Sequence, residues 1–114
     1  MYLRAAFASL FLALPAFAQD LATGDAIKAA IADKTVQGSM VESGAYTEFY
    51  AADGTIKGDG YTGTWTVEGD QMCFNYGEGA SCWSARLSGE TVTWVKDGKD
   101  DGTGTLIAGN VNNY

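Results

Sequence analysis

The chain has 114 residues and a net charge of −7, with 15 glycines, two cysteines and no histidine. Such an acidic chain is repelled by phosphate backbones and by anionic lipid surfaces, so its charge argues against nucleic-acid binding and against docking on a membrane. Its length allows one domain with a modest core. The missing histidine excludes the usual general base near neutral pH and the commonest metal ligand.

The first 18 residues have the order of a secretory signal peptide. Arg4 precedes an apolar run over residues 5–14, and the segment ends in Ala16-Phe17-Ala18. A basic start, an apolar stretch and a small-x-small end form the export signature, and the run is shorter than the roughly 20 residues that span a bilayer. A membrane-anchoring helix is the alternative. We expect residues 1–18 to be removed, with no membrane insertion afterwards, and a periplasmic or secreted location for residues 19–114, which form a single β domain.

Residues 24–33 are the segment with helical periodicity. Ile27, Ala30 and Ile31 recur at spacings of three and four residues, and Thr23 precedes them as a candidate N-cap. The apolar stripe is narrow. We therefore predict one short N-terminal helix that packs on a sheet or plugs an open end.

Glycine-containing turns divide the rest of the chain into short β-rich runs. These runs cover residues 35–42, 45–52, 55–58, 63–68, 71–76, 81–87, 91–96 and 103–108. Short strands at regular spacing, each ended by a tight turn, are typical of an antiparallel meander, and helix-length crossovers for a parallel sheet are missing. The sequence predicts a mainly β fold, with about eight short strands in a barrel or a sandwich after one short helix.

Alternation within the runs assigns one face of each strand to the core. The inward sets are Trp65 with Val67; Met72, Phe74 and Tyr76; Trp83, Ala85 and Leu87; and Val92 with Trp94. An eight-stranded barrel has room for side chains or for one small ligand. Because the inward sets hold several large rings, we expect a barrel interior filled by side chains.

Cys73 and Cys82 are expected to form a structural disulfide. Both lie in the exported part of the chain, where an even pair in an oxidising compartment is bridged. Pairing them across a hairpin centres the turn on Gly77-Glu78, which predicts a two-residue loop. Alternation places the bridge on the outer face. The chain has no C-x-x-C motif that would indicate a redox role.

The remaining chemical inventory argues against catalysis, cofactors and metals. With both cysteines bridged and no histidine, the common nucleophile systems cannot be built, and Arg86 is the one arginine after the leader. Paired carboxylates are the one catalytic option left. Residues 97–102 resemble a calcium loop, but Lys99 and Ala108 stand where ligands are needed, so this segment is predicted to be a hairpin turn.

Three tyrosines exceed what a small core needs. Tyr46, Tyr50 and Tyr61, together with the terminal Tyr114, lie in or beside the predicted strands. Exposed tyrosine often marks a binding surface. We therefore take Tyr46, Tyr50 and Tyr61 as candidate surface-binding residues, with packing at a strand edge as the alternative.

Part of the chain resembles a set of small exported alphaproteobacterial proteins of unknown function. The shared pattern is Y-x-x-D-G-T at residues 50–55, G-x-W-x-V-x-G-D at residues 63–70, and then Cys73 and Cys82. This resemblance implies export and no particular activity. Gly63-Thr64-Trp65 is also similar to the G-x-W motif of lipocalins, although that motif lies in the first lipocalin strand. The similarity implies a small calycin-like barrel, and a fold alone does not assign a function.

Three functions follow as hypotheses. The first is a non-catalytic exported domain, not an enzyme, that binds a macromolecule on its surface, with a basic exported protein as the partner favoured by charge. The second is a carrier of a small apolar ligand inside a calycin-like barrel. The third is a small carboxylate-dependent hydrolase. The sequence leaves the partner and the oligomeric state open.

Overall fold

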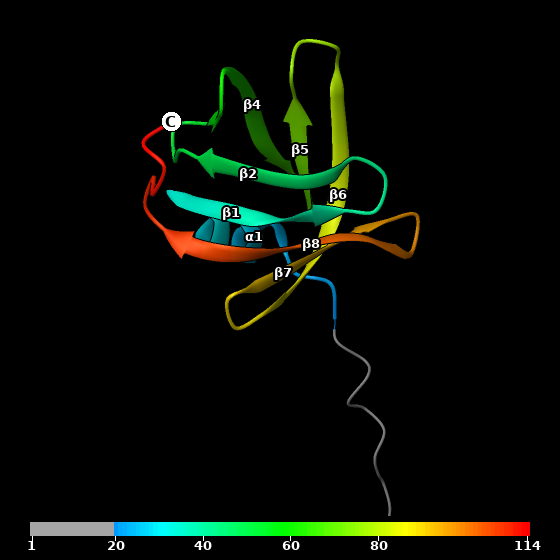
Figure 1. The fold of residues 1–114 in the computed structure, drawn as a ribbon. Coiled ribbons are helices and arrows are strands. Elements are labelled where there is room, and N and C mark those ends of the chain that lie inside the picture. Colours follow the sequence, from blue (N-terminus) through cyan, green and yellow to red (C-terminus); the bar gives the residue numbers. More distant parts are fainter. Residues whose placement is uncertain (1–19) are drawn as a thin grey trace, which may run out of the picture.

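The computed structural model describes residues 20–114, so the predicted signal peptide lies outside the described residues. Within them the chain forms one helix followed by eight strands (Figure 1). The elements are α1 (Gly24–Ile31), β1 (Lys34–Met40), β2 (Gly44–Tyr50), β3 (Thr55–Gly58), β4 (Tyr61–Glu68), β5 (Gln71–Asn75), β6 (Ala80–Ser88), β7 (Thr91–Lys96) and β8 (Lys99–Ala108). No helix among residues 20–114 is long and apolar enough to cross a membrane.

The eight strands form a closed antiparallel barrel in sequence order. Each strand pairs with the next, and β1 also pairs with β8 from Lys34 opposite Ala108 to Met40 opposite Gly102. The predicted meander is therefore confirmed, and the open choice between barrel and sandwich is settled as a barrel. The ladders differ in length: β1 and β2 share seven residue pairs, whereas β2 and β3 share two.

Two turns differ from their predicted form. The β7–β8 hairpin turns at Asp97 and Gly98, both with positive φ, and β8 already begins at Lys99. The hairpin expected at residues 97–102 is thus confirmed but is shorter than predicted. In the β5–β6 hairpin, Asn75 pairs with Ala80, so residues 76–79 form a four-residue loop, and the predicted two-residue loop is wrong. The Asn75 side chain accepts a hydrogen bond from the Gly77 N–H at 2.8 Å, which starts the turn earlier than spacing alone indicates.

The predicted disulfide is present. Cys73 and Cys82 lie directly opposite each other with their Cα atoms 4.0 Å apart, and they are bridged. Met72 and Phe74 on either side belong to the core cluster, whereas Cys73 does not. The bridge therefore lies on the outer face of the sheet, as alternation predicted.

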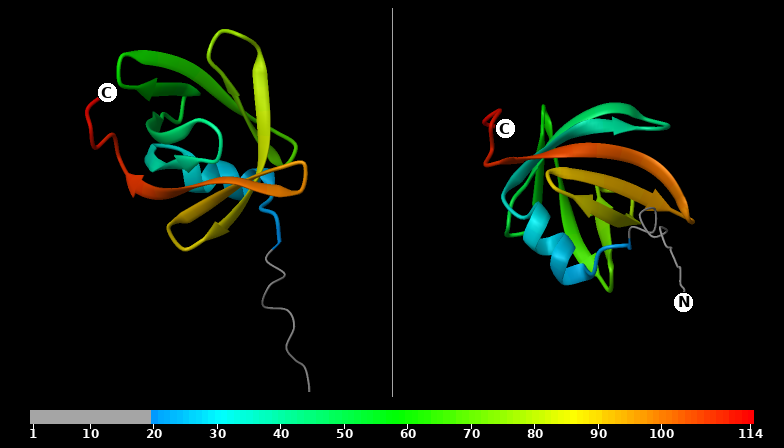
Figure 2. Two further views of the ribbon diagram at one scale, coloured as in Figure 1. Left: turned by 45° about the vertical axis from the view of Figure 1, so that its right-hand side comes forward. Right: turned by 90° about the horizontal axis from the view of Figure 1, so that it is seen from below.

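Helix α1 closes one end of the barrel (Figure 2). Thr23 caps it as predicted, with its hydroxyl accepting from the Ala26 N–H at 3.2 Å. Ile27 and Ile31 are fully buried against the strands. A glycine is required at position 24, because a Cβ there would collide with the Gly69 carbonyl in the β4–β5 turn. The helix thus plugs the end at which the β4–β5 turn lies.

The core cluster combines aliphatic side chains with the rings of Tyr50, Trp65, Phe74 and Trp94. Its fully buried aliphatic side chains are Ile27, Ile31, Val36, Ile56, Met72 and Val92. The end opposite the helix, where the β1–β2 and β5–β6 turns lie, holds a pocket of about 720 Å³. The expectation of a filled interior is therefore wrong for this end.

Candidate functional site

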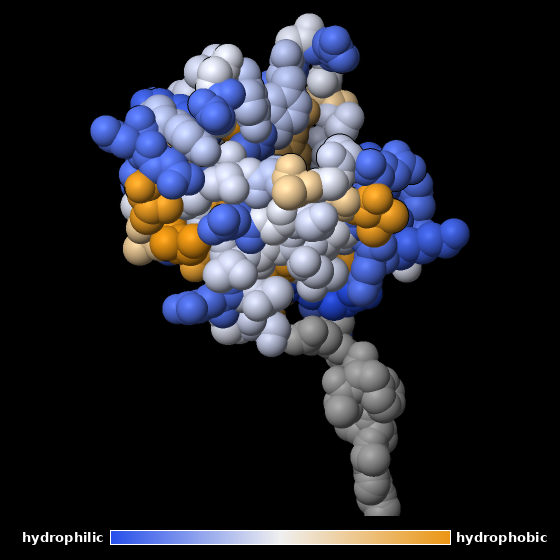
Figure 3. All heavy atoms as spheres, in the orientation of Figure 1, coloured by the Kyte–Doolittle hydropathy of each residue, from blue (hydrophilic) through white to orange (hydrophobic). Residues whose placement is uncertain are grey.

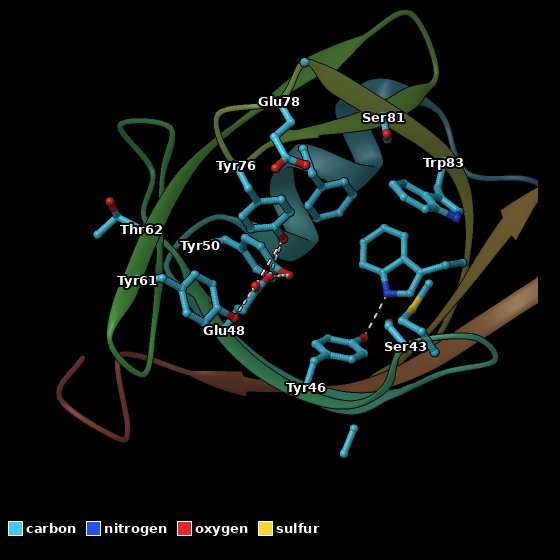
Figure 4. Close-up of a pocket in the computed structure, with 15 residues that line it drawn as sticks. Ser43, Tyr46, Glu48, Tyr50, Tyr61, Thr62, Tyr76, Glu78, Ser81 and Trp83 are labelled. Atoms are coloured by element: carbon cyan, nitrogen blue, oxygen red, sulfur yellow. Dashed lines mark hydrogen bonds between the residues drawn. The ribbon is translucent and has the colours of Figure 1, made fainter.

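Seven of the 15 residues that line the pocket in the open end of the barrel carry aromatic rings (Figure 4). The rings belong to Tyr46, Tyr50, Tyr61, Phe74, Tyr76, Trp83 and Trp94. Two carboxylates, Glu48 and Glu78, also line it, and no lysine or arginine does so among the described residues. The volume lies within the range of roughly 300–1,000 Å³ that is typical of small-molecule sites.

Strand β2 supplies the inner wall of the site. Tyr46, Glu48 and Tyr50 are two residues apart, and successive side chains of a strand alternate between faces, so all three point inward. Glu48 lies opposite Val36 of β1, which is fully buried. The register between β1 and β2 therefore carries an ionisable side chain into the barrel beside an aliphatic core residue.

The Glu48 carboxylate is held by three tyrosines. It is 5% exposed and accepts hydrogen bonds from Tyr50 at 2.6 Å, from Tyr61 at 2.5 Å, and from Tyr76 at 2.9 and 3.1 Å. Tyr61 begins β4 and Tyr76 follows β5, so the donors come from three parts of the barrel. Burial of a polar group without partners is costly, and these hydroxyls supply the partners. The close-up shows their oxygens converging on Glu48 (Figure 4).

The Glu48 carboxylate has no cationic partner among residues 20–114. The ion pair formed in this part of the chain joins Arg86 to Asp100 at 2.6 Å. The Lys96 ammonium donates to the Cys82 carbonyl at 3.0 Å and lies 4.3 Å from the centre of the Trp83 ring. Among residues 20–114, the side-chain donors to the buried carboxylate are therefore neutral phenols.

The pocket tyrosines are held in their neutral form. Burial raises the pKa of Tyr46 to about 12, against a smaller lowering by the hydrogen bond with Trp94. Burial raises the pKa of Tyr50 well above its ordinary value, and the charge of Glu48 adds to this. The pKa values of Tyr61 and Tyr76 are raised by burial and by Glu48 in the same direction. At neutral pH these hydroxyls are therefore donors to Glu48.

Aromatic contacts fix the floor of the pocket. The Phe74 ring packs edge-on against Tyr50, Trp83 and Trp94 with centroid distances of 5.8, 5.5 and 5.4 Å. The Trp94 indole N–H donates to the Tyr46 hydroxyl at 2.9 Å, and that hydroxyl donates to the Thr103 carbonyl at 3.1 Å. Edge-to-face pairs of this kind are favourable beyond the area they bury, and they restrict ring rotation.

Glycines make room for the rings. A Cβ at Gly104 would lie 2.5 Å from the Tyr46 hydroxyl oxygen, and a Cβ at Gly63 would lie 2.9 Å from Tyr76 Cδ1. A bulge between Trp94 and Val95 shifts the β7–β8 register beside the pocket. Bulges re-aim side chains and recur beside functional sites.

The structure brings the predicted tyrosines together, but not on the outer surface. Tyr46, Tyr50 and Tyr61 all line the pocket. Tyr50 is 1% exposed, so its assignment to a surface is wrong, whereas Tyr61 stands at the rim and is 44% exposed. Tyr114 is not among the lining residues, and its backbone contacts Asn110. Tyr46 and Tyr50 share one face of β2 because they lie an even number of positions apart, and the burial of Tyr50 identifies this face as the inner one.

Sequence reasoning missed Glu48, Tyr76 as a hydrogen-bond donor, and Glu78. The available signal was the pattern Tyr46-x-Glu48-x-Tyr50, which places a carboxylate on the same face as two tyrosines. Tyr76 was predicted as a core residue. It is 48% exposed, and only its hydroxyl end reaches Glu48.

Three donors face the Glu48 carboxylate. A carboxylate has about four acceptor sites, and the single Tyr76 proton is shared between both oxygens, so three hydroxyl protons serve these sites. Among residues 20–114 no group of three or more histidine, cysteine or carboxylate side chains is placed to hold a metal ion.

Comparisons of the chain with protein families, curated proteins and solved structures found no match. The resemblance to small exported proteins therefore stays a prediction from the sequence pattern.

Proposed function

We propose that this domain is a non-catalytic binding protein that takes a small molecule into the open end of its barrel. The observation that carries the proposal is the pocket of about 720 Å³, which combines seven aromatic side chains with one buried carboxylate. Small-molecule sites are typically concave and apolar, with a few fixed polar groups that orient the ligand. Helix α1 closes the other end, so the site has a single mouth.

The alternative of a macromolecule bound on the surface has less support. The tyrosines that motivated it line the pocket instead. Figure 3 shows a face dominated by polar and neutral residues, with apolar residues in small, separate areas. The exposed large aliphatic residues among those described are Leu21, Val41 and Val111. A basic exported protein as partner thus rests on net charge alone and stays a prediction, as does a periplasmic or secreted location.

The hydrolase alternative has one observation in its favour. Glu48 and Glu78 line the same pocket, and paired carboxylates can cleave glycosidic bonds. However, three tyrosine hydroxyls take most of the about four acceptor sites of Glu48, which opposes a role as base or nucleophile. These contacts support binding over catalysis.

A neutral fluorescent probe tests the proposal. N-phenyl-1-naphthylamine brightens in apolar surroundings, and we expect saturable 1:1 binding by the wild-type protein. Ser81 lines the pocket on the inner face of β6, so Ser81→Phe should fill the mouth and weaken binding at least about tenfold. Ser84 does not line the pocket and lies on the outer face of the same strand, so Ser84→Phe is the matched control.

The control variant should bind the probe like the wild type, with both variants checked for native circular dichroism. Non-saturable brightening, or equal affinity in the two variants, would show that the pocket is not the binding site.

A further inference from the structure

We propose that the pocket selects organic cations that carry a methylated ammonium group, with Glu48 as the counter-ion. This inference rests on the proposed function, because it names the class of ligand that the same pocket takes. It also replaces the apolar ligand of the carrier hypothesis with a charged one.

The charge of the pocket has one sign. Glu48 is 5% exposed and has no cationic partner among the described residues, and Glu78 adds a second carboxylate to the lining. A buried charge without a counter-charge is costly, and a bound cation would supply the missing one. A carboxylate ligand such as a fatty acid would meet like charge and would be excluded.

The walls of the pocket suit a cation better than a neutral molecule. Tyr50, Tyr61 and Tyr76 surround the Glu48 carboxylate, and Tyr46 lies beside them (Figure 4). The Trp94 indole donates to the Tyr46 hydroxyl and lines the same pocket. The faces of such rings attract positive charge, and cages of aromatic rings are a recurring way to recognise quaternary ammonium groups. The phenols stay neutral because their pKa values are raised, so they keep donating to Glu48 and do not carry charges of their own.

The hydrogen bonds around Glu48 favour a methylated ammonium group over a primary one. Three hydroxyls already contact both carboxylate oxygens. These donors take about three of the four acceptor sites of the carboxylate, and Glu48 is 5% exposed, so an N–H donor would find one acceptor site with little access to it. A methylated ammonium group needs no acceptor, because it interacts through its charge and through contact with the rings.

Choline and 3,3-dimethylbutan-1-ol separate charge from shape. The two molecules have the same outline, and only choline is charged. We expect choline to displace N-phenyl-1-naphthylamine from the wild-type protein with at least about tenfold higher affinity than the neutral isostere. Ethanolamine, which carries a primary ammonium group, should compete more weakly than choline.

Glu48→Gln tests the counter-ion. It keeps the shape of the side chain and removes its charge, so the preference for choline over the isostere should fall to less than about threefold while the neutral probe still binds. Glu90→Gln removes the same charge from the exposed β6–β7 turn, outside the lining, and should leave the preference unchanged.

Equal displacement by choline and its isostere would overturn the inference while the proposed function stands, because the probe would still report an occupied pocket. Stronger competition by ethanolamine would overturn the choice of a methylated group. Failure of the probe to bind would instead contradict the proposed function, and direct calorimetry with choline would then decide the inference alone. The comparison of choline with its isostere uses the unaltered protein, so it decides the question even where Glu48→Gln fails to fold.

Discussion

Glu48 is an unusual residue for the inside of a small barrel. Its neighbours on the same face of β2 are Tyr46 and Tyr50, and Tyr61 and Tyr76 reach it from other strands. A carboxylate that accepts several charge-assisted hydrogen bonds is strongly held, because such bonds are about twice as strong as neutral ones. Each phenol is in turn kept protonated by burial and by the negative charge beside it. The residue and its donors therefore behave as one unit.

Because of this unit, the stability of the folded protein changes with pH in the alkaline range. The folded pKa of Tyr46 is about 12, and those of Tyr50, Tyr61 and Tyr76 are also raised, whereas an unfolded tyrosine titrates near 10. Above about pH 10 the folded state therefore binds more protons than the unfolded state, and stability falls as pH rises. We expect the free energy of unfolding, measured by urea titration, to keep its full tyrosine contribution below about pH 10 and to decline from there to about pH 12.

Tyr46→Phe provides the control for this prediction. It removes one of the raised groups, so its decline with pH should be shallower than that of the wild type. The other ionisable groups are the same in both proteins, so their contributions cancel in the comparison. Parallel curves for the two proteins would contradict the assignment.

At the level of elements, the β5–β6 hairpin carries both the disulfide and part of the site. Cys73 and Cys82 tie the two strands together on the outer face, while Phe74 and Trp83 project into the pocket from the same strands. The bridge closes a short loop around residues 76–79. It thus restricts the segment from which Tyr76 and Glu78 approach the mouth.

Removing the bridge should destabilise the domain without changing its fold. The chain-entropy model gives a loop of this length roughly 2–3 kcal/mol. We expect the double variant Cys73→Ser with Cys82→Ser to lose about that amount of unfolding free energy in a denaturant titration. The wild-type protein under a reducing agent should match the variant. Equal stability of the oxidised protein and the variant would show that the bridge constrains the unfolded chain little.

Local patterns predicted the elements well. Turn residues and alternation gave the strands, and Thr23 with the Ile27–Ile31 spacing gave the helix. The β5–β6 loop was missed because the Asn75 side chain bonds to the backbone, which spacing does not reveal. The site was harder still. Tyr61 and Tyr76 meet Glu48 only through the curvature of the closed barrel, and these contacts span 13 and 28 residues.

For the whole molecule, the fold has one closed and one open end. Helix α1 follows residues 20–23 and plugs one end, so the described chain begins near the end away from the mouth.

We expect cleavage after Ala18. The basic start, apolar run and Ala-x-Ala end of residues 1–18 motivate this. Intact-mass analysis of protein recovered from the periplasm or the medium should give a chain that begins at Gln19. Ala18→Phe should block processing, because the peptidase requires a small residue there. Exported protein that still begins at Met1 would contradict the prediction.

The short ladder between β2 and β3 has a consequence for motion. With two residue pairs it is the shortest strand pairing in the barrel. Local opening needs the least free energy where the fewest contacts break, so we expect the barrel to open first between β2 and β3. The hydrogen bond from Tyr61 to Glu48 links β2 to β4 across this same side of the barrel. A ligand held at Glu48 would bind the closed ring better than the opened one, and it would therefore raise the free energy of opening. Ligand binding in the pocket and local opening of the barrel wall are thus linked equilibria, so a measurement of one reports on the other.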